Sequence, residues 1–351
     1  MNSLRFQPTL KLTRPFGKTV ILTVFILVGL VSLLEIATRL SFIQSKLPPP
    51  SIGSPNTSLE ANLHVLDELG SFDCIFIGSS FVLQGINPAF FEKSYQKTTG
   101  ETIRCYTFGV RGLTASGVEV LAPLLIERYH PRWLIYAIHP RDLATAVDES
   151  GYSQKDLDQV PWVHQQQGDF SLAGWLSEYS HFYRYYLTFR NWDEQTFVYD
   201  LEDRQNLETI FRSTRGYQVI FLTQALPLPP DTQTKLRKYY AAYAINPPEL
   251  QSLRRLLQAP SETKMIMVEF PLLSQIFEDN LFLPEDYDTY AQTIQDSADL
   301  AQTLYIRVNE QLTIPDNGWK DASHLNTVGA TAYSDWLGEQ IGRIVNMGHL
   351  K

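Results

Sequence analysis

The sequence has few cysteines and lacks the spacing that a metal site would require. Only Cys74 and Cys105 occur in 351 residues, so the chain is not a disulfide scaffold. No Cys/His cluster has metal-ligand spacing, and we expect neither a metal nor another cofactor. Both cysteines lie in apolar runs, where we expect buried free thiols. A single disulfide is the alternative, because the chain is predicted to face an oxidising compartment.

The sequence also lacks a long basic run, internal repeats and low-complexity tracts. With a formal net charge of −9, the chain is a poor candidate for binding nucleic acid. Apolar residues make up 44% and charged residues 19%, as expected for a chain that folds around a core. The length suits one large domain or two small ones.

One long apolar run is present near the N-terminus. Residues 19–34 read TVILTVFILVGLVSLL, and the apolar pattern continues past Glu35 to about residue 40. This length is close to what a helix needs to cross a bilayer. The positive-inside rule places the N-terminus in the cytoplasm and the rest of the chain outside, in the periplasm or at the cell surface. A cleaved signal peptide and a buried helix are the alternatives. The basic residues before the run are Arg5, Lys11, Arg14 and Lys18.

These patterns divide the chain into segments. We expect a cytoplasmic tail over residues 1–18, a transmembrane signal anchor over 19–40 and a linker over 41–66. The linker contains KLPPPSIGSPNTS, which is typical of a stiff, polar tether. An α/β domain is predicted to follow over residues 67–347.

Short apolar runs alternate with helical patterns in this domain. Such alternation predicts a parallel sheet of about five strands between two helical layers, with its functional site at the carboxyl ends of the strands. Residues 143–262 separate the third strand from the fourth, and we expect a mostly helical insertion there. Its aromatic segment, 175–192, is predicted to pack against the sheet or to line a sugar or acyl groove. The expected strands are 72–77, 103–108, 133–138, 265–270 and 304–308.

Two polar motifs stand at the predicted carboxyl edge. Ser80 ends a Gly-Ser-Ser turn after the first strand, where backbone N–H groups could hold an oxyanion. Asp321 and His324 stand after the last strand. A serine hydroxyl needs a base to accept its proton, and the imidazole needs a carboxylate to fix its tautomer. An Asp three residues before a His can supply both from one loop.

Together these motifs resemble the SGNH (GDSL-like) hydrolase and acyltransferase superfamily. GSSFVLQGINP, from residue 78, is similar to its serine block, and TFGVRGLTASG, from residue 107, to its glycine block. DASHLNTVGATAYS, from residue 321, is similar to its Asp-x-x-His block. The resemblance implies a flavodoxin-like SGNH fold, with Ser80 as nucleophile, Asp321 and His324 as its supporting pair, and Ser80 and Gly112 as oxyanion N–H donors.

One block departs from the family pattern. The family has Gly-x-Asn-Asp after its third strand, and here residues 139–142 read HPRD. Arg141 therefore takes the position of the Asn that donates to the oxyanion, with a different reach and geometry. It is either a third oxyanion donor or a residue that only shapes the loop. A Pro-Arg-Asp variant resembles membrane-tethered proteins of cell-envelope acyl transfer.

The resemblance implies an acyl-serine enzyme acting on an ester or an O-acylated polysaccharide of the envelope. Water or a sugar hydroxyl would be the acceptor. The alternatives are a catalytically degenerate SGNH-like domain that binds a glycan or an assembly partner, and an unrelated α/β domain with a structural role in the envelope.

Overall fold

A five-stranded parallel sheet forms the centre of the molecule. The computed structural model describes residues 14–147, 151–190, 194–224 and 226–350. Within these residues the strand order is β2-β1-β3-β4-β5, and every neighbouring pair is parallel. The predicted α/β fold with a five-stranded parallel sheet is confirmed. The strands are β1 Cys74–Gly78, β2 Cys105–Gly109, β3 Trp133–Ile138, β4 Lys264–Glu269 and β5 Leu304–Ile306.

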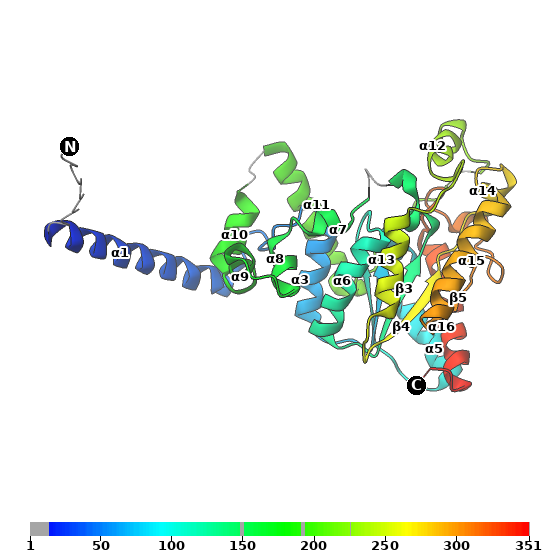
Figure 1. Cartoon of the computed structure of the whole chain (residues 1–351), viewed down its shortest axis with the longest axis horizontal. Helices are drawn as coiled ribbons and strands as arrows, with labels where there is room; N and C mark the ends of the chain where they lie inside the picture. The colour runs from blue at the N-terminus through cyan, green and yellow to red at the C-terminus, as the bar shows by residue number, and fades with distance from the viewer. Residues whose placement is uncertain (1–13, 148–150, 191–193, 225, 351) are drawn as a thin grey trace, which may run out of the picture.

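Helices cover both faces of this sheet. In Figure 1, α3, α6, α13 and α15 stand across the face turned toward the viewer, and α5 and α16 pack together on the other face. Strands β1, β2 and β3 are buried throughout, as expected for a sheet covered on both sides. The helices of the α/β domain outside the insertion, together with α13, are α3 Thr57–Leu69, α4 Ser80–Gly85, α5 Pro88–Thr99, α6 Ala115–Tyr129, α13 Pro247–Gln258, α14 Ser274–Glu278, α15 Pro284–Leu300 and α16 Thr327–Asn346. A short 3₁₀ helix, η3 Asp316–Gly318, precedes α16.

The expectation of two free thiols was wrong. Cys74 and Cys105 face each other across paired positions of β1 and β2 and form a disulfide. Their Cα atoms are 4.6 Å apart, and both residues are fully buried. The register of β1 against β2 places the two cysteines opposite each other, and the sequence does not specify that register.

The N-terminal helix projects away from the domain. Helix α1, Arg14–Arg39, contains a stretch from Gly17 to Arg39 that is long and apolar enough to cross a membrane, and none of its most apolar window is buried inside the protein. A signal sequence would have the same properties. Figure 1 shows α1 extending to the left as a single rod. Residues 1–13 of the predicted tail lie outside the described residues.

The predicted linker, 41–66, differs from the structure in its second half. Residues 57–66 belong to α3, whose buried face carries the polar residues Ser58, Glu60 and Asn62. These polar side chains bond to neighbouring backbone groups, and they are buried together with the apolar residues Leu59, Leu63 and Leu66 of the same helix. A short helix, α2 Ser41–Gln44, connects α1 to the tether.

The insertion is mostly helical, with one extended segment over residues 217–224. Its aromatic segment lies next to α1, and Trp192 is outside the described residues. Trp175, Tyr179 and Tyr186 are exposed, which differs from the expectation that the aromatics pack on the sheet. The helices between β3 and β4 are η1 Pro140–Leu143, η2 Thr145–Val147, α7 Gln154–Leu157, α8 Pro161–Gln166, α9 Leu172–Tyr179, α10 His181–Phe189, α11 Glu194–Thr214, α12 Pro230–Tyr240 and α13.

Candidate active site

Ser80 occupies the first position of a short helix that begins where β1 ends. Strand β1 lies between β2 and β3, where the connections change direction, and ligands bind at such a switch point. Gly78 allows the tight turn. A Cβ atom there would lie 2.5 Å from Val82 Cγ2 and 3.0 Å from the Ala137 carbonyl oxygen. The absence of a side chain at Gly78 therefore lets α4 start immediately after the strand and present Ser80 at the sheet edge.

The structure brings Ser80, His324 and Asp321 into one hydrogen-bonded relay. Ser80 Oγ lies 2.8 Å from His324 Nε2. On the other side of the ring, His324 Nδ1 lies 2.9 and 3.0 Å from the two carboxylate oxygens of Asp321. A charged Asp321 accepts the Nδ1 proton, which leaves Nε2 free to accept the proton of the serine hydroxyl. The His324 side chain is 22% exposed, so the relay lies open to solvent.

The Asp321 carboxylate is stabilised in its charged form. Partial burial acts to raise its pKa, but the hydrogen bond and charge of His324 oppose this effect. Backbone N–H groups of Ser323 and His324, each 2.9 Å from Asp321 Oδ1, act in the same direction as the imidazole. The resulting pKa is about 2, so Asp321 remains an acceptor throughout the physiological pH range.

Two backbone N–H groups without acceptors in the described part of the chain follow the carboxyl ends of the paired strands β1 and β2. The N–H of Ser80 is in the first turn of α4, where a helix supplies no acceptor. Among the described residues, the N–H of Gly112 also has no acceptor. Gly112 adopts a left-handed φ of 77°, which favours glycine, and its loop is held to the serine turn by the Val110 N–H, 2.9 Å from the Gly78 carbonyl oxygen.

Helix α3 holds this glycine loop in place, and the sequence analysis missed it. Asn62 Nδ2 donates to the Gly109 carbonyl at 2.8 Å, and Asn56 Nδ2 donates to the Arg111 carbonyl at 2.9 Å. The Arg111 N–H donates to Ser58 Oγ at 2.8 Å. A TSLEAN pattern with polar residues on one helical face could have indicated such a role, had the segment not been assigned to the linker.

The histidine loop is held by a part of the insertion. Asn326 caps α16 by accepting from the Val328 N–H, and its Nδ2 donates to the Leu222 carbonyl at 3.1 Å. The Thr327 N–H donates to the Ile220 carbonyl at 2.8 Å, and the Gln224 N–H donates to Trp319 at 2.7 Å. The extended segment 220–224 therefore lies along the loop that carries His324. Asn326, two residues after the histidine, was detectable only as a helix cap.

The His324 imidazole belongs to a stack of three rings. Phe81 lies between His324 and His139, with ring centroids 4.8 and 3.8 Å away and interplanar angles of 23° and 20°. His139 is fully buried. Burial, together with the charges of Arg141 and His324, lowers its pKa well below the ordinary value. His139 is thus a neutral packing partner, and its Nδ1 accepts the Arg141 N–H at 3.1 Å.

Arg141 and Asp142 follow His139 on η1. Arg141 lies close enough for its charge to lower the pKa of His139, and among the described residues its guanidinium has no hydrogen-bond partner. Asp142 is fully buried and accepts from the His139 N–H at 3.1 Å and from the Tyr136 hydroxyl at 3.4 Å. Burial raises the pKa of Asp142 to about 7 against the opposing charge of Arg141. Whether Arg141 donates to an oxyanion stays a prediction.

Within the part of the chain that the structure describes, no group of three or more His, Cys, Asp or Glu side chains is placed to hold a metal ion. The site therefore consists of a hydroxyl, an imidazole, a carboxylate and backbone donors. Chemically, this set can accept a proton from a nucleophile and stabilise developing negative charge on oxygen.

No protein-family model and no curated protein matches the chain. Solved structures with a similar arrangement include a gut microbial diltiazem-metabolizing enzyme, at 13% identity and a TM-score of 0.35, covering 77% of this chain. The chain spans 47% of the length of that enzyme. The inhibitor-bound aryl esterase of M. smegmatis is similar at 9% identity and a TM-score of 0.34, over 78% of this chain and 99% of that chain. Similarities this remote carry no argument about activity.

Proposed function

We propose that the protein is a membrane-anchored serine enzyme of the SGNH type that hydrolyses esters or transfers O-acyl groups. The observation that supports this proposal is the continuous relay from Ser80 Oγ through His324 to Asp321, at the sheet edge where two backbone N–H groups of the described residues have no acceptor. A helix cap with a nearby surface histidine would explain Asp321 and His324, but it would not require a serine 2.8 Å from the ring.

The mechanism follows from these positions. His324 Nε2 accepts the Ser80 hydroxyl proton while Oγ attacks the ester carbonyl, and Asp321 stabilises the imidazolium that forms. The N–H groups of Ser80 and Gly112 hold the oxyanion, with Arg141 as a third donor. Collapse of the tetrahedral intermediate breaks the bond to the alcohol, which leaves with the proton from His324. Water or a sugar hydroxyl then attacks the acyl-serine while His324 accepts its proton, and the acyl–Oγ bond breaks as His324 returns that proton to Ser80 Oγ.

The proposed location is the outer side of a membrane. Helix α1 supplies the span, and the basic residues that precede it favour a cytoplasmic N-terminus. The Cys74–Cys105 disulfide suits an oxidising compartment, which the catalytic domain would occupy in this orientation. Substrates available there include O-acylated polysaccharides of the envelope or of exported material, and assembly proteins of the envelope are the corresponding partners.

A fluorophosphonate probe tests the nucleophile directly. Full-length protein in detergent should form a covalent adduct, with the modified peptide containing Ser80, and Ser80→Ala should abolish the adduct. Ser79→Ala is the matched control, because Ser79 is the neighbouring serine and is buried. The Ser79→Ala protein should remain labelled if it keeps the wild-type melting temperature. Labelling that survives Ser80→Ala would contradict the assignment.

A catalytically degenerate, glycan-binding or partner-binding domain is the second candidate. The departure at Arg141, in place of the family's Asn, favours it. Mass spectrometry of envelope glycans from cells carrying wild type or Ser80→Ala separates the two. A change in O-acylation with Ser80→Ala supports the enzyme, whereas unchanged glycans together with an unlabelled wild type support the binding domain.

A further inference from the structure

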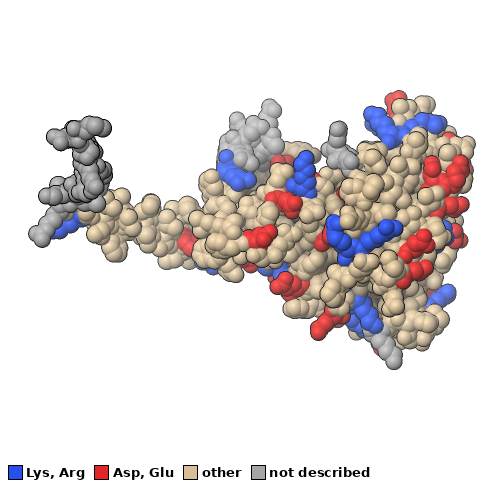
Figure 2. Space-filling model, viewed as in Figure 1, with Lys and Arg blue, Asp and Glu red and all other residues tan. Residues whose placement is uncertain are grey.

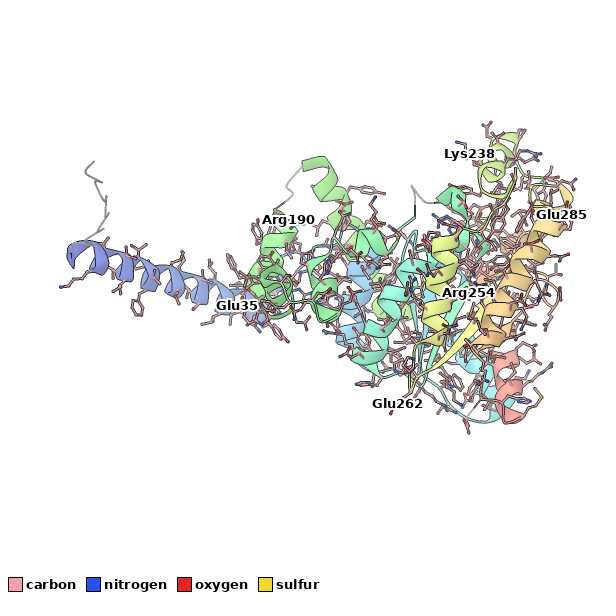
Figure 3. The ribbon with its side chains drawn as sticks, viewed as in Figure 1. Glu35, Arg190, Lys238, Arg254, Glu262 and Glu285 are labelled. Carbon is pink, nitrogen blue, oxygen red and sulfur yellow. A yellow bond between two sulfur atoms is a disulfide. The ribbon has the colours of Figure 1, made fainter. Side chains whose placement is uncertain are left out.

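The apolar helix α1 is fixed to the domain by hydrogen bonds at its last turns. The Glu35 carboxylate accepts from the N–H groups of His181 and Phe182, each at 3.0 Å, and from Ser180 Oγ at 2.7 Å. Arg39 Nη2 donates to the Tyr179 carbonyl at 2.7 Å. Glu35 therefore caps the start of α10 and Arg39 caps the end of α9, in agreement with the preferred charge at each helix end. Figure 3 shows Glu35 at this junction.

The chain beyond α1 stays close to α10. Gln44 Nε2 lies 3.4 Å from His181 Nδ1, and the Ser51 N–H donates to Thr188 Oγ1 at 3.1 Å. Helices α9 and α10 thus lie directly beside the point where α1 leaves the domain, as Figure 1 also shows. The surface of a membrane crossed by α1 would lie next to α9 and α10.

Helix α9 buries small residues and exposes apolar ones, which is the reverse of the arrangement expected for a helix in water. The residues that it buries are Gly174 and Ser177. A Cβ atom at Gly174 would lie 2.5 Å from the Pro161 carbonyl oxygen of α8, so this face packs closely on the domain. The opposite face carries Leu172, Trp175 and Tyr179, spaced three and four residues apart, with exposed fractions of 65%, 45% and 57%.

Two further exposed apolar side chains belong to segments that adjoin α9 and α1. Phe170 precedes α9 and is 75% exposed, and Phe42 on α2 is 74% exposed. In the view of Figure 2, mostly uncharged surface continues from α1 onto the adjoining end of the domain, with the charged residues concentrated farther from α1. We name Phe42, Phe170, Leu172, Trp175 and Tyr179 the α9 surface. Apolar surface of this kind marks a contact with a partner or with lipid.

We propose that the α9 surface lies in the headgroup region of the bilayer that α1 spans. The α9 surface is continuous with the end of the membrane helix, because Arg39 of α1 bonds directly to Tyr179 of α9. Trp and Tyr are the side chains that concentrate at membrane interfaces, since each joins an apolar ring to a polar group. The domain is therefore attached to the membrane at two places, a spanning helix and an interfacial helix.

Quenching of tryptophan fluorescence by brominated lipid tests the proposal. Full-length protein is reconstituted into liposomes whose acyl chains carry bromine near the headgroup end. Trp175→Phe should lose most of the lipid-dependent quenching that the wild type shows. Trp336→Phe is the matched control, because Trp336 is on α16, which packs on α5 at the far side of the domain from α1. This control variant should retain the wild-type quenching.

The outcomes separate this proposal from the anchoring on which it rests. If the protein floats with the liposomes and Trp175→Phe changes the quenching no more than Trp336→Phe does, the α9 surface is outside the lipid and the proposal is overturned. Capture of that surface by a second protein, with no quenching, would overturn it in the same way. A wild-type chain that does not float with liposomes would overturn both the anchor and the interfacial contact, while leaving the fluorophosphonate result unaffected.

Discussion

The sheet edge with the proposed catalytic residues (the catalytic edge) and the end of the domain where α1 joins it (the membrane-proximal end, if α1 spans a membrane as proposed) place their polar groups in opposite ways. At the catalytic edge, apolar side chains lie inside, and the partly buried Ser80 and His324 lie at the surface with two N–H groups that have no acceptor among the described residues. At the membrane-proximal end, α9 buries Gly174 and Ser177 and exposes Leu172 and Trp175. Each arrangement suits the medium that we propose for it, water with a polar substrate in one case and lipid in the other. Substitutions should therefore affect one region without the other.

Asp321→Asn should have the largest effect, confined to the catalytic edge. An amide can hold the imidazole in the tautomer that protonates Nε2, which leaves no acceptor for the Ser80 proton. We expect the rate of ester hydrolysis or of fluorophosphonate labelling to fall about 10⁴-fold, with unchanged flotation on liposomes. Asp316→Asn, on the exposed 3₁₀ helix η3 nearby, is the control and should keep the wild-type rate. A loss of less than tenfold with Asp321→Asn would argue against the relay.

Asp142→Asn should change how stability depends on pH. Burial raises the pKa of Asp142 from 3.8 to about 7 in the folded protein, so the folded state holds a proton that the unfolded state releases between these values. The free energy of unfolding should therefore fall as pH rises from about 4 to about 7, by up to about 4 kcal/mol for this group. The variant should lack that fall, as measured by denaturant unfolding of the full chain in detergent at several pH values.

Asp321 provides the comparison with opposite sign. Its pKa is lowered to about 2, so its contribution to stability is present above pH 4 and is lost as pH falls toward 2. The Asp142→Asn variant should still lose stability as pH falls from 4 toward 2. A profile for Asp142→Asn that matches the wild type between pH 4 and 7 would show that Asp142 titrates normally.

Glu35→Gln should have the smallest effect, confined to the membrane-proximal end. The substitution keeps the shape of the side chain and removes the negative charge at the start of α10, which should weaken the cap by about 1 kcal/mol. Amide hydrogen exchange at His181 and Phe182 should become about five times faster in the reconstituted protein. Glu339→Gln, on an exposed face of α16, is the control. Unchanged exchange in α10, or a changed labelling rate at Ser80, would contradict the separation of the two regions.

The sheet was predictable from the sequence because its strands are continuous apolar runs. The expected strand at 133–138 coincides with β3, and the run at 72–77 begins two residues before β1, because Phe72 is buried without joining the ladder. The disulfide and α3 were not predictable in the same way. Pairing of Cys74 with Cys105 depends on strand register, and α3 buries polar residues that satisfy backbone groups far along the chain.

The candidate site was predictable where it depends on short motifs after strands. Ser80, Asp321 and His324 were chosen for their positions after β1 and β5, and the structure brings their side chains together. The supporting residues carried no comparable signal. Phe81 has the appearance of an ordinary core residue, and segment 220–224 is an apolar stretch within the insertion that nothing in the sequence connects to the histidine loop.

Helix α3 fixes the position of the tether, whereas a flexible linker would have no fixed position. Glu60 accepts hydrogen bonds from Ser51, Ile52 and Ser54 of the tether, and Asn62, two residues farther on, holds the Gly109 carbonyl. The tether and the glycine loop are thus braced by the same turn of one helix. If α1 spans a membrane as proposed, this rigid connection fixes the distance between the lipid and Ser80, and the proposed enzyme would act on substrates presented at that distance.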